Sequence, residues 1–129
     1  MLRVLIIDDS PLFLDSFCWL LERYPGVTVV ATASNGDDGW RAAALLAPDL
    51  VFVDLNIAGL DGLGLATRLL RQHPRMRVVI VSLNDGAEYR TRAAASGVER
   101  FVGKADLFRD LPSILADPPA LPDGHGALW

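Results

Sequence analysis

The 129-residue chain is expected to fold as an α/β protein, a (βα)5 doubly wound parallel sheet with strand order 2-1-3-4-5. Five short apolar runs predict the strands, and they lie at residues 4–7, 27–31, 50–53, 78–81 and 98–102. The segments between them carry helix signals, and such strand–helix alternation is typical of parallel sheets with right-handed crossovers. The first four runs are continuous or nearly so and rich in β-branched residues, as in strands buried on both faces.

The first helix is expected after the first strand, beginning at Ser10 and Pro11, which suit an N-cap and a first helical position. Apolar side chains, Phe13 among them, fall on one broad face of this segment, and helix packing is expected to account for Trp19. The pair Pro25-Gly26 is expected to end this helix.

The second and third helices have similar signals at their ends. The second opens at Asn35 or Gly36, after the second strand, and Pro48 stops it. The third starts near Asp61, carries leucines on one face and ends before Pro74. Both segments therefore fit as crossovers between parallel strands.

The fourth helix is expected at about 85–97, with Arg90 on a solvated surface, and the fifth at about 106–116. Residues 1–116 would then form one domain with the flavodoxin-like strand order. Proline and glycine without periodicity fill 117–129, which predicts a flexible tail or the stub of a linker.

The composition excludes several classes of protein. Hydrophobic residues make up 51% of the chain and charged residues 22%, which supplies a buried core. A net charge of −4 argues against a nucleic-acid surface on this domain, and the single cysteine, Cys18, excludes an internal disulfide framework. With no apolar run of about 18 residues and no signal peptide, we expect a soluble cytoplasmic domain that does not enter the membrane.

Polar side chains stand at the carboxyl ends of the expected strands. Asp8 and Asp9 follow the first strand, Asp54 the third, Ser82 the fourth and Lys104 the fifth. In the order 2-1-3-4-5 these four strands are consecutive neighbours, so we expect the side chains to converge at one edge. Three close carboxylates raise one another's proton affinity unless a cation is present, and Mg²⁺ suits carboxylates completed by waters and a phosphate.

The convergence favours phosphoryl chemistry over a purely structural role. Lys104 is the only lysine among 12 basic residues, and its compact charge can reach a phosphoryl oxygen. The Ser82 hydroxyl can donate to a second oxygen, and a central Asp54 fits a nucleophile that accepts a phosphoryl group. Taken singly, Asp8 and Asp9 fit helix capping equally well.

These residues resemble the receiver domain of two-component response regulators, over about residues 2–116. The resemblance rests on VLIIDDS at 4–10, VDLNIAGLDG at 53–62, VS at 81–82 and FVGK at 101–104. The second of these motifs, together with the stretch from Asn84 to Leu111, looks most like the LuxR/NarL-type branch, whose members carry a C-terminal helix-turn-helix domain.

The resemblance implies a metal-dependent phosphoacceptor. Asp54 would accept the phosphoryl group, and Asp9 and Asp54 would bind Mg²⁺ directly. Asp8 would act largely through water, and Asn56 would offer its backbone carbonyl.

It also implies a switch and a set of partners. Ser82 and Lys104 would hold the phosphoryl oxygens, and Phe101 takes the position of an aromatic switch residue, with half-buried packing as the alternative. The surface around the fourth helix, fifth strand and fifth helix would change. The donor would be a sensor histidine kinase or a phosphotransfer protein, a homodimer is a further option, and DNA would be reached only through a C-terminal domain outside these residues.

Three positions depart from the family's usual pattern. Ala58 and Ala105 stand where many receivers have proline, and Leu83 stands where a small residue is common. Loss of proline after Lys104 is expected to loosen the loop that aims the lysine, and Leu83 to narrow access to the pocket. None of the three removes a charge that the chemistry requires.

Three other functions compete with a phosphoacceptor switch. A phosphatase that turns over needs a second acid two residues after Asp54, where Asn56 stands, so at most slow self-dephosphorylation is expected. A flavin-binding domain needs a phosphate loop after the first strand, where Asp8 and Asp9 would repel a phosphate. A receiver-like module that binds partners without phosphorylation stays open because of Leu83 and Ala105.

Overall fold

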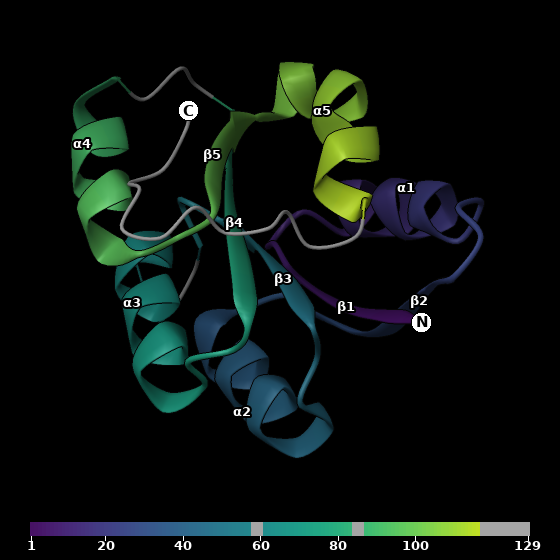
Figure 1. The fold of residues 1–129 in the computed structure, drawn as a ribbon, viewed down its shortest axis with the longest axis horizontal. Helices are drawn as coiled ribbons and strands as arrows, with labels where there is room; N and C mark the ends of the chain where they lie inside the picture. Colours follow the sequence, from purple (N-terminus) through teal and green to yellow (C-terminus); the bar gives the residue numbers. More distant parts are fainter. Residues whose placement is uncertain (58–60, 84–86, 117–129) are drawn as a thin grey trace.

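The computed structural model describes residues 1–57, 61–83 and 87–116 (Figure 1). Over these residues, five parallel strands form one sheet in the order β2-β1-β3-β4-β5. The strands are β1 (Leu2–Ile7), β2 (Val27–Ala33), β3 (Leu50–Asp54), β4 (Arg77–Ser82) and β5 (Arg100–Gly103). The predicted fold class and strand order are therefore confirmed.

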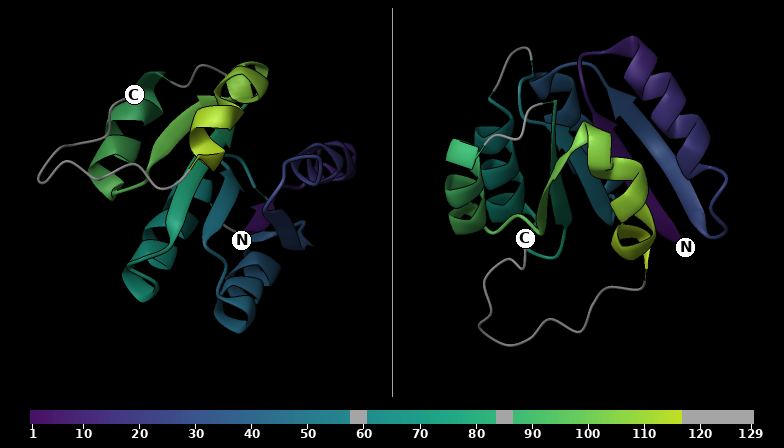
Figure 2. Two further views of the ribbon diagram at one scale, coloured as in Figure 1. Left: turned by 45° about the vertical axis from the view of Figure 1, so that its right-hand side comes forward. Right: turned by 90° about the horizontal axis from the view of Figure 1, so that it is seen from above.

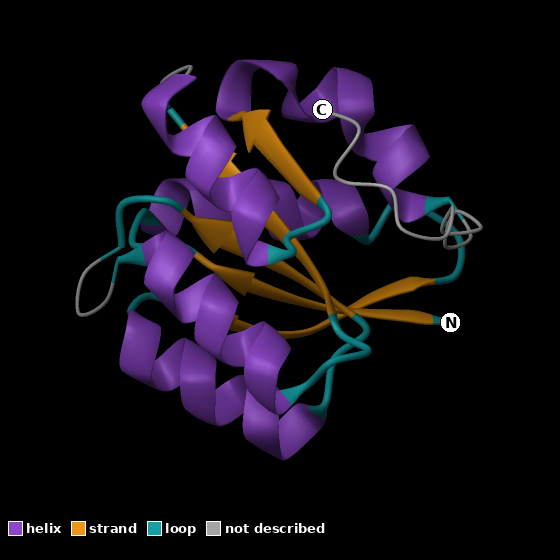
Figure 3. Cartoon of the chain, turned by 60° about the vertical axis from the view of Figure 1, so that its left-hand side comes forward, coloured by secondary structure: helices purple, strands orange, loops and turns teal. Residues whose placement is uncertain are grey.

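Helices cover both faces of this sheet (Figures 2 and 3). One face carries α1 (Pro11–Leu21) and α5 (Leu107–Leu115), and a 3-10 turn, η1 (Lys104–Asp106), leads into α5. The other face carries α2 (Gly36–Leu46), α3 (Gly62–Gln72) and α4 (Ala87–Ser96). The two helical layers leave the carboxyl ends of the strands open at one edge, as expected for a doubly wound sheet.

The three central strands, β1, β3 and β4, are largely buried on both faces, which explains their continuous apolar sequences. In β1, Leu5 and Ile7 pack into the core under α2 and α3, whereas Val4 and Ile6 pack into the core under α1 and α5. All four side chains have no exposed surface. Because alternate residues of a strand point to opposite faces, both sets must be apolar here.

Side-chain caps fix where three helices begin. The Ser10 hydroxyl accepts a hydrogen bond from the Phe13 amide at 3.2 Å, and Asn35 caps α2 through the Asp38 amide at 2.8 Å. Asp61 caps α3 through the Gly64 amide at 3.3 Å. Each cap satisfies a backbone donor that lacks a partner in the first helical turn. These starts agree with the predicted ones.

Some boundaries differ from the predicted ones. Helix α1 ends at Leu21 and is followed by a turn that includes Gly26 at φ +79°, so the helix stops before Pro25. Strand β5 starts at Arg100, two residues later than predicted, although Val98 is buried in the core.

Two surface residues differ from the expectation, since Trp19 is not packed between helices and Arg90 is not fully solvated. Trp19 is 62% exposed, and the Arg23 guanidinium lies 4.7 Å from its ring centre. Arg90 is partly buried, with its guanidinium 5.0 Å from the ring centre of Phe101.

The predicted tail at 117–129 and the departure at Ala58 lie outside the described residues. Within the described part of the chain, no helix is both long enough and apolar enough to cross a membrane.

Candidate functional site

Three carboxylates meet at the carboxyl edge of the sheet. Asp8 follows β1, Asp9 comes next, and Asp54 ends the neighbouring strand β3. One oxygen from each of them lies within 4.8 Å of the others. Asp8 is 1% exposed and Asp54 7%, whereas Asp9 faces solvent. The structure thus brings together the three acidic residues that the sequence singles out.

Asp8 is the most deeply buried of the three, and both of its oxygens have a neighbour. The Ser10 amide donates a hydrogen bond to Oδ1 at 2.9 Å. The Lys104 ammonium lies 2.8 Å from Oδ2, and the Lys104 side chain is only 14% exposed. A buried carboxylate needs such compensation, because an unpaired charge in the interior is costly.

The Asp54 carboxyl group is placed where its ionised form is disfavoured. Burial raises the pKa of Asp54 from 3.8 to about 6, and the negative charges of Asp8 and Asp9 add to the rise. The nearby Lys104 and a hydrogen bond from the Asn56 amide, 3.3 Å from Oδ1, oppose that rise in pKa. The group therefore favours an added cation, either a proton or a metal ion.

The donor atoms of this cluster suit a hard divalent ion. Carboxylate oxygens of Asp8, Asp9 and Asp54 are the ligands that Mg²⁺ prefers, and exposed Asp9 leaves one side of the cluster accessible to water. The structure places Asn56 directly beyond β3, where its amide bonds to Asp54. The predicted ligand role of the Asn56 carbonyl stays a prediction.

Close backbone packing sets the position of Asp54 relative to α3. A Cβ atom added at Gly62 would lie 2.1 Å from the backbone oxygen of Asp54. The Gly62 amide also donates a hydrogen bond to the Leu55 carbonyl at 3.0 Å. Only glycine lets α3 begin this close to the end of β3.

The Lys104 ammonium has two close neighbours, and Ala105 follows this residue in place of proline. Lys104 opens the turn η1, and besides its ion pair with Asp8 the ammonium lies 4.1 Å from the ring centre of Phe13. The loosening expected from the missing proline stays a prediction.

Ser82 and Phe101 lie inside the protein. Ser82 ends β4 with no exposed surface, opposite Gly103 in the register of β5. Phe101 is 2% exposed, so it is buried and not half-buried as the alternative held. Leu83, by contrast, is 77% exposed and so fills no part of this buried region.

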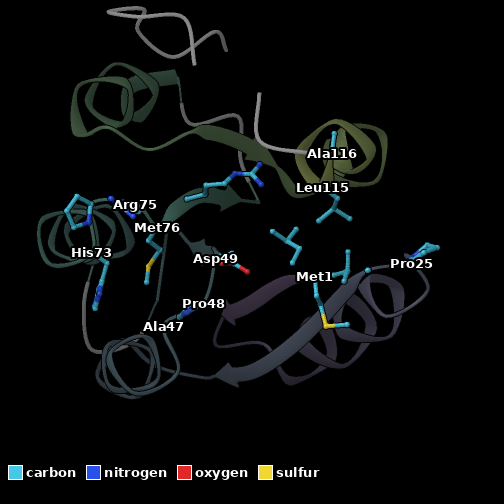
Figure 4. Close-up of a pocket in the computed structure, with 15 residues that line it drawn as sticks. Met1, Pro25, Ala47, Pro48, Asp49, His73, Arg75, Met76, Leu115 and Ala116 are labelled. Atoms are coloured by element: carbon cyan, nitrogen blue, oxygen red, sulfur yellow. The ribbon is translucent and has the colours of Figure 1, made fainter. Parts of the chain in front are cut away.

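A cavity of about 960 Å³ lies at the opposite, amino-terminal edge of the sheet (Figure 4). Its wall includes Met1, Leu2, Pro48, Met76 and Leu115. None of the predicted site residues lines this cavity. Among the described residues, the predicted site residues lie instead at the carboxyl edge, the usual ligand-binding edge of such sheets.

Sequence reasoning missed two contacts in this region. Phe13 was expected only on the packed face of α1, and nothing in its spacing indicates that its ring lies against Lys104. The contact between Arg90 and Phe101 joins α4 to β5 and was also missed. Such pairs depend on side-chain rotamers, which a sequence pattern does not specify.

Comparison with known proteins gives one family over nearly the whole chain. The family described as response regulator receiver domain matches residues 4–115. A protein-glutamate methylesterase/protein-glutamine glutaminase of Symbiobacterium thermophilum is 38% identical over 104 residues, 80% of this chain and 29% of that protein. The nitrate/nitrite response regulator protein NarL of Escherichia coli K12 is 34% identical over 101 residues, 78% of this chain and 47% of that protein. The chain thus spans less than half the length of these relatives.

Solved structures agree with this result. A LuxR-family two-component response regulator from Aurantimonas sp. SI85-9A1 has a TM-score of 0.80 and 28% identity, covering 88% of this chain and 84% of that one. The response regulator domain of Thermotoga maritima CheB has a TM-score of 0.77 and 25% identity, covering 89% and 91%. The likeness to the LuxR/NarL branch is thus confirmed. The likeness to methylesterases was not anticipated.

Proposed function

The chain belongs to the response regulator receiver domain family, and we propose that it is a phosphoacceptor switch whose acceptor is Asp54. The donor is the phosphohistidine of a sensor kinase or of a phosphotransfer protein. One observation carries the proposal: Asp54 lies in a cluster of three carboxylates beside the half-buried side chain of Lys104. Aspartyl nucleophiles need such neighbours, because charge develops on the phosphoryl oxygens during transfer.

The proposed transfer forms one bond to phosphorus and breaks one. A carboxylate oxygen of Asp54 attacks phosphorus, and the phosphorus–nitrogen bond to the donor imidazole breaks. The bonding electron pair remains on the imidazole nitrogen, and Asp54 becomes an acyl phosphate. Lys104, held beside Asp8 before transfer, is near enough to Asp54 to affect its pKa and can pair with a phosphoryl oxygen.

The carboxylate cluster also supports a role for Mg²⁺. We propose that Asp9 and Asp54 bind it directly, Asp8 through water, and Asn56 through its carbonyl. Bound Mg²⁺ would offset the negative charge of the carboxylates and of the incoming phosphoryl oxygens. Without it, the negative charges of Asp8 and Asp9 oppose the approach of a phosphoryl group.

The switch itself would start at Ser82. Its hydroxyl belongs to a fully buried residue, and we propose that the end of β4 rearranges when this hydroxyl contacts a phosphoryl oxygen. The phosphoryl group adds a charge of about −1.5 to −2, and this charge biases the rearrangement. We propose that the surface of α4, β5 and α5 changes with it, with Phe101 and Arg90 linking α4 to β5.

We propose that the chain is not a phosphatase that turns over. Asn56 cannot serve as a general acid or base two residues after Asp54, so the acyl phosphate would be lost only slowly. An accumulated, slowly hydrolysed phosphoryl group is what a switch requires.

The output of the switch is a separate proposal. Likeness to LuxR/NarL regulators supports control of transcription, with DNA bound by a C-terminal helix-turn-helix domain outside these residues. The methylesterase relative, at 38% identity, supports control of an attached or separate effector enzyme as a second candidate. We propose that phosphoryl transfer to Asp54 takes place in the cytoplasm. We also propose that the chain forms a homodimer.

Beryllofluoride, which mimics a phosphoryl group on a carboxylate, tests the proposed acceptor. We expect the parent chain to bind it in Mg²⁺, giving a new bound signal in fluorine NMR. Asp54→Asn should give no bound signal under the same conditions, and EDTA should abolish it in the parent. If the parent binds nothing, the site is not a phosphoryl site. A receiver-like module that works without phosphorylation is then the better interpretation.

A further inference from the structure

The Lys104 ammonium lies between a carboxylate and an aromatic ring. Its nitrogen is 2.8 Å from Asp8 Oδ2 and 4.1 Å from the ring centre of Phe13. Only 14% of the Lys104 side chain is exposed, so protein groups replace much of the water around it. The electron-rich face of Phe13 supplies part of that replacement, because a ring face attracts a desolvated cation.

The ring of Phe13 is itself fixed by other aromatic rings. It stacks on Phe17 with ring centres 5.2 Å apart, and Phe17 meets Phe52 edge-on at 4.9 Å. Phe52 lies in β3, two residues before Asp54. A continuous row of rings thus connects the strand that carries the acceptor to the surface on which the lysine rests.

Hydrogen bonds from backbone amides to side chains also link Asp8 to Phe13. Asp8 Oδ1 accepts a hydrogen bond from the Ser10 amide, and the Ser10 hydroxyl accepts one from the Phe13 amide. The Phe13 ring then faces Lys104, which pairs with Asp8 Oδ2. The contacts therefore form a closed set of four residues, which are Asp8, Ser10, Phe13 and Lys104. Phe13 is restrained through both its backbone amide and its ring.

We propose that Phe13 is a positioning residue for Lys104, an inference that rests on the proposed function. The lysine stem has several rotatable bonds, and the ring confines the ammonium to the vicinity of the acidic cluster. A cation–ring contact has little directionality, so the ammonium can move from Asp8 to a phosphoryl oxygen without leaving the ring.

The contact can be measured directly because Lys104 is the only lysine in the chain. In the full chain grown with carbon-13 lysine, we expect the methylene protons beside the ammonium to resonate upfield, displaced by the ring. The displacement should persist in Phe13→Tyr and disappear in Phe13→Leu. Leu12→Ala, a change at the neighbouring residue of α1 with 78% exposure, should leave it unaltered.

The consequence for phosphorylation uses the same variants. With acetyl phosphate and Mg²⁺, Phe13→Leu should accept the phosphoryl group about fivefold to tenfold more slowly than the parent. Phe13→Tyr should restore most of the rate, and Leu12→Ala should match the parent. Circular dichroism confirms that each variant is folded, and Phe13→Met supplies a second ring-free variant.

The outcomes separate this inference from the proposed function. A parent that accepts no phosphoryl group from any donor overturns the proposed function, and with it this inference, whatever the lysine resonance shows. A parent that is phosphorylated while Phe13→Leu is folded and equally fast overturns the role of Phe13 alone. An undisplaced lysine resonance in the parent also overturns that role.

Discussion

At the scale of single residues, the carboxyl group of Asp54 is the most informative, because its environment opposes its own charge. Burial, with Asp8 and Asp9 adding to the effect, raises the pKa of Asp54 from 3.8 to about 6. Lys104 offsets only part of this. A group held in this way gains from any cation that joins it, which is why the site suits metal-assisted acceptance of a phosphoryl group.

The raised pKa predicts how stability depends on pH. Because the folded protein binds the Asp54 proton more tightly than the unfolded chain does, ionisation penalises the folded state. The penalty is absent below pH 4, grows between pH 4 and 6, and is complete above pH 6. In metal-free buffer at pH 8, Asp54→Asn should therefore be more stable than the parent by about 3 kcal/mol.

Urea denaturation of both proteins across this pH range measures the difference. The stability gap should close as the pH falls to 4. A gap that stays constant with pH, or a less stable variant at pH 8, would contradict the assigned environment of Asp54. Asp15→Asn, a change at an exposed carboxylate in α1, serves as the matched control.

The positions of the polar site residues follow from the sequence, whereas their side-chain contacts do not. Parallel strand order alone brings the ends of β1, β3, β4 and β5 to one edge. The ring contact of Phe13 with Lys104 and the full burial of Phe101 depend instead on how neighbouring side chains fill space. No sequence period encodes that packing.

At the scale of elements, the start of α3 determines the position of Asp54, the proposed acceptor. Gly62 lets the first turn of α3 touch the backbone at the end of β3, where an added Cβ would lie 2.1 Å from the Asp54 oxygen. Because the obstacle is backbone and not a flexible side chain, α3 or the end of β3 would have to shift.

We therefore expect Gly62→Ala to destabilise the fold by about 2 to 3 kcal/mol and to slow phosphoryl acceptance. Gly64→Ala is a matched control in the same turn, since its Cβ would come no closer than 3.7 Å to a neighbour. Alanine also favours helix, so Gly64→Ala should be neutral or stabilising. Chemical denaturation of both variants provides the test, and equal stabilities would refute the close-packing argument.

Element ends were harder to predict than element types. The continuous apolar runs predicted the strands because both faces of the sheet are covered. Strand β5 starts at Arg100 and not at Val98, because Val98 is buried without taking part in strand hydrogen bonding. The 3-10 turn η1 precedes α5, where only the helix was expected. Local sequence does not distinguish a buried connection from the first residue of a strand.

At the scale of the whole molecule, topology explains why one edge carries the chemistry. The order β2-β1-β3-β4-β5 brings residues from 8 to 104 together, and α1 supplies the ring that lies against the lysine. Fold and family were both accessible from the sequence, because several motifs recur in the right order at strand ends. The process that the chain regulates could not be predicted from the sequence, since the relatives include both a methylesterase and a nitrate/nitrite regulator.

We propose that Asp54 accepts a phosphoryl group in a Mg²⁺-dependent reaction. The most direct measurement is the intact mass of the chain after incubation with acetyl phosphate, with Mg²⁺ or with EDTA, beside Asp54→Asn. We predict a gain of one phosphoryl group in the parent with Mg²⁺, and no gain in the variant or with EDTA. An equal gain in Asp54→Asn, or a gain that does not require the metal, would contradict this function.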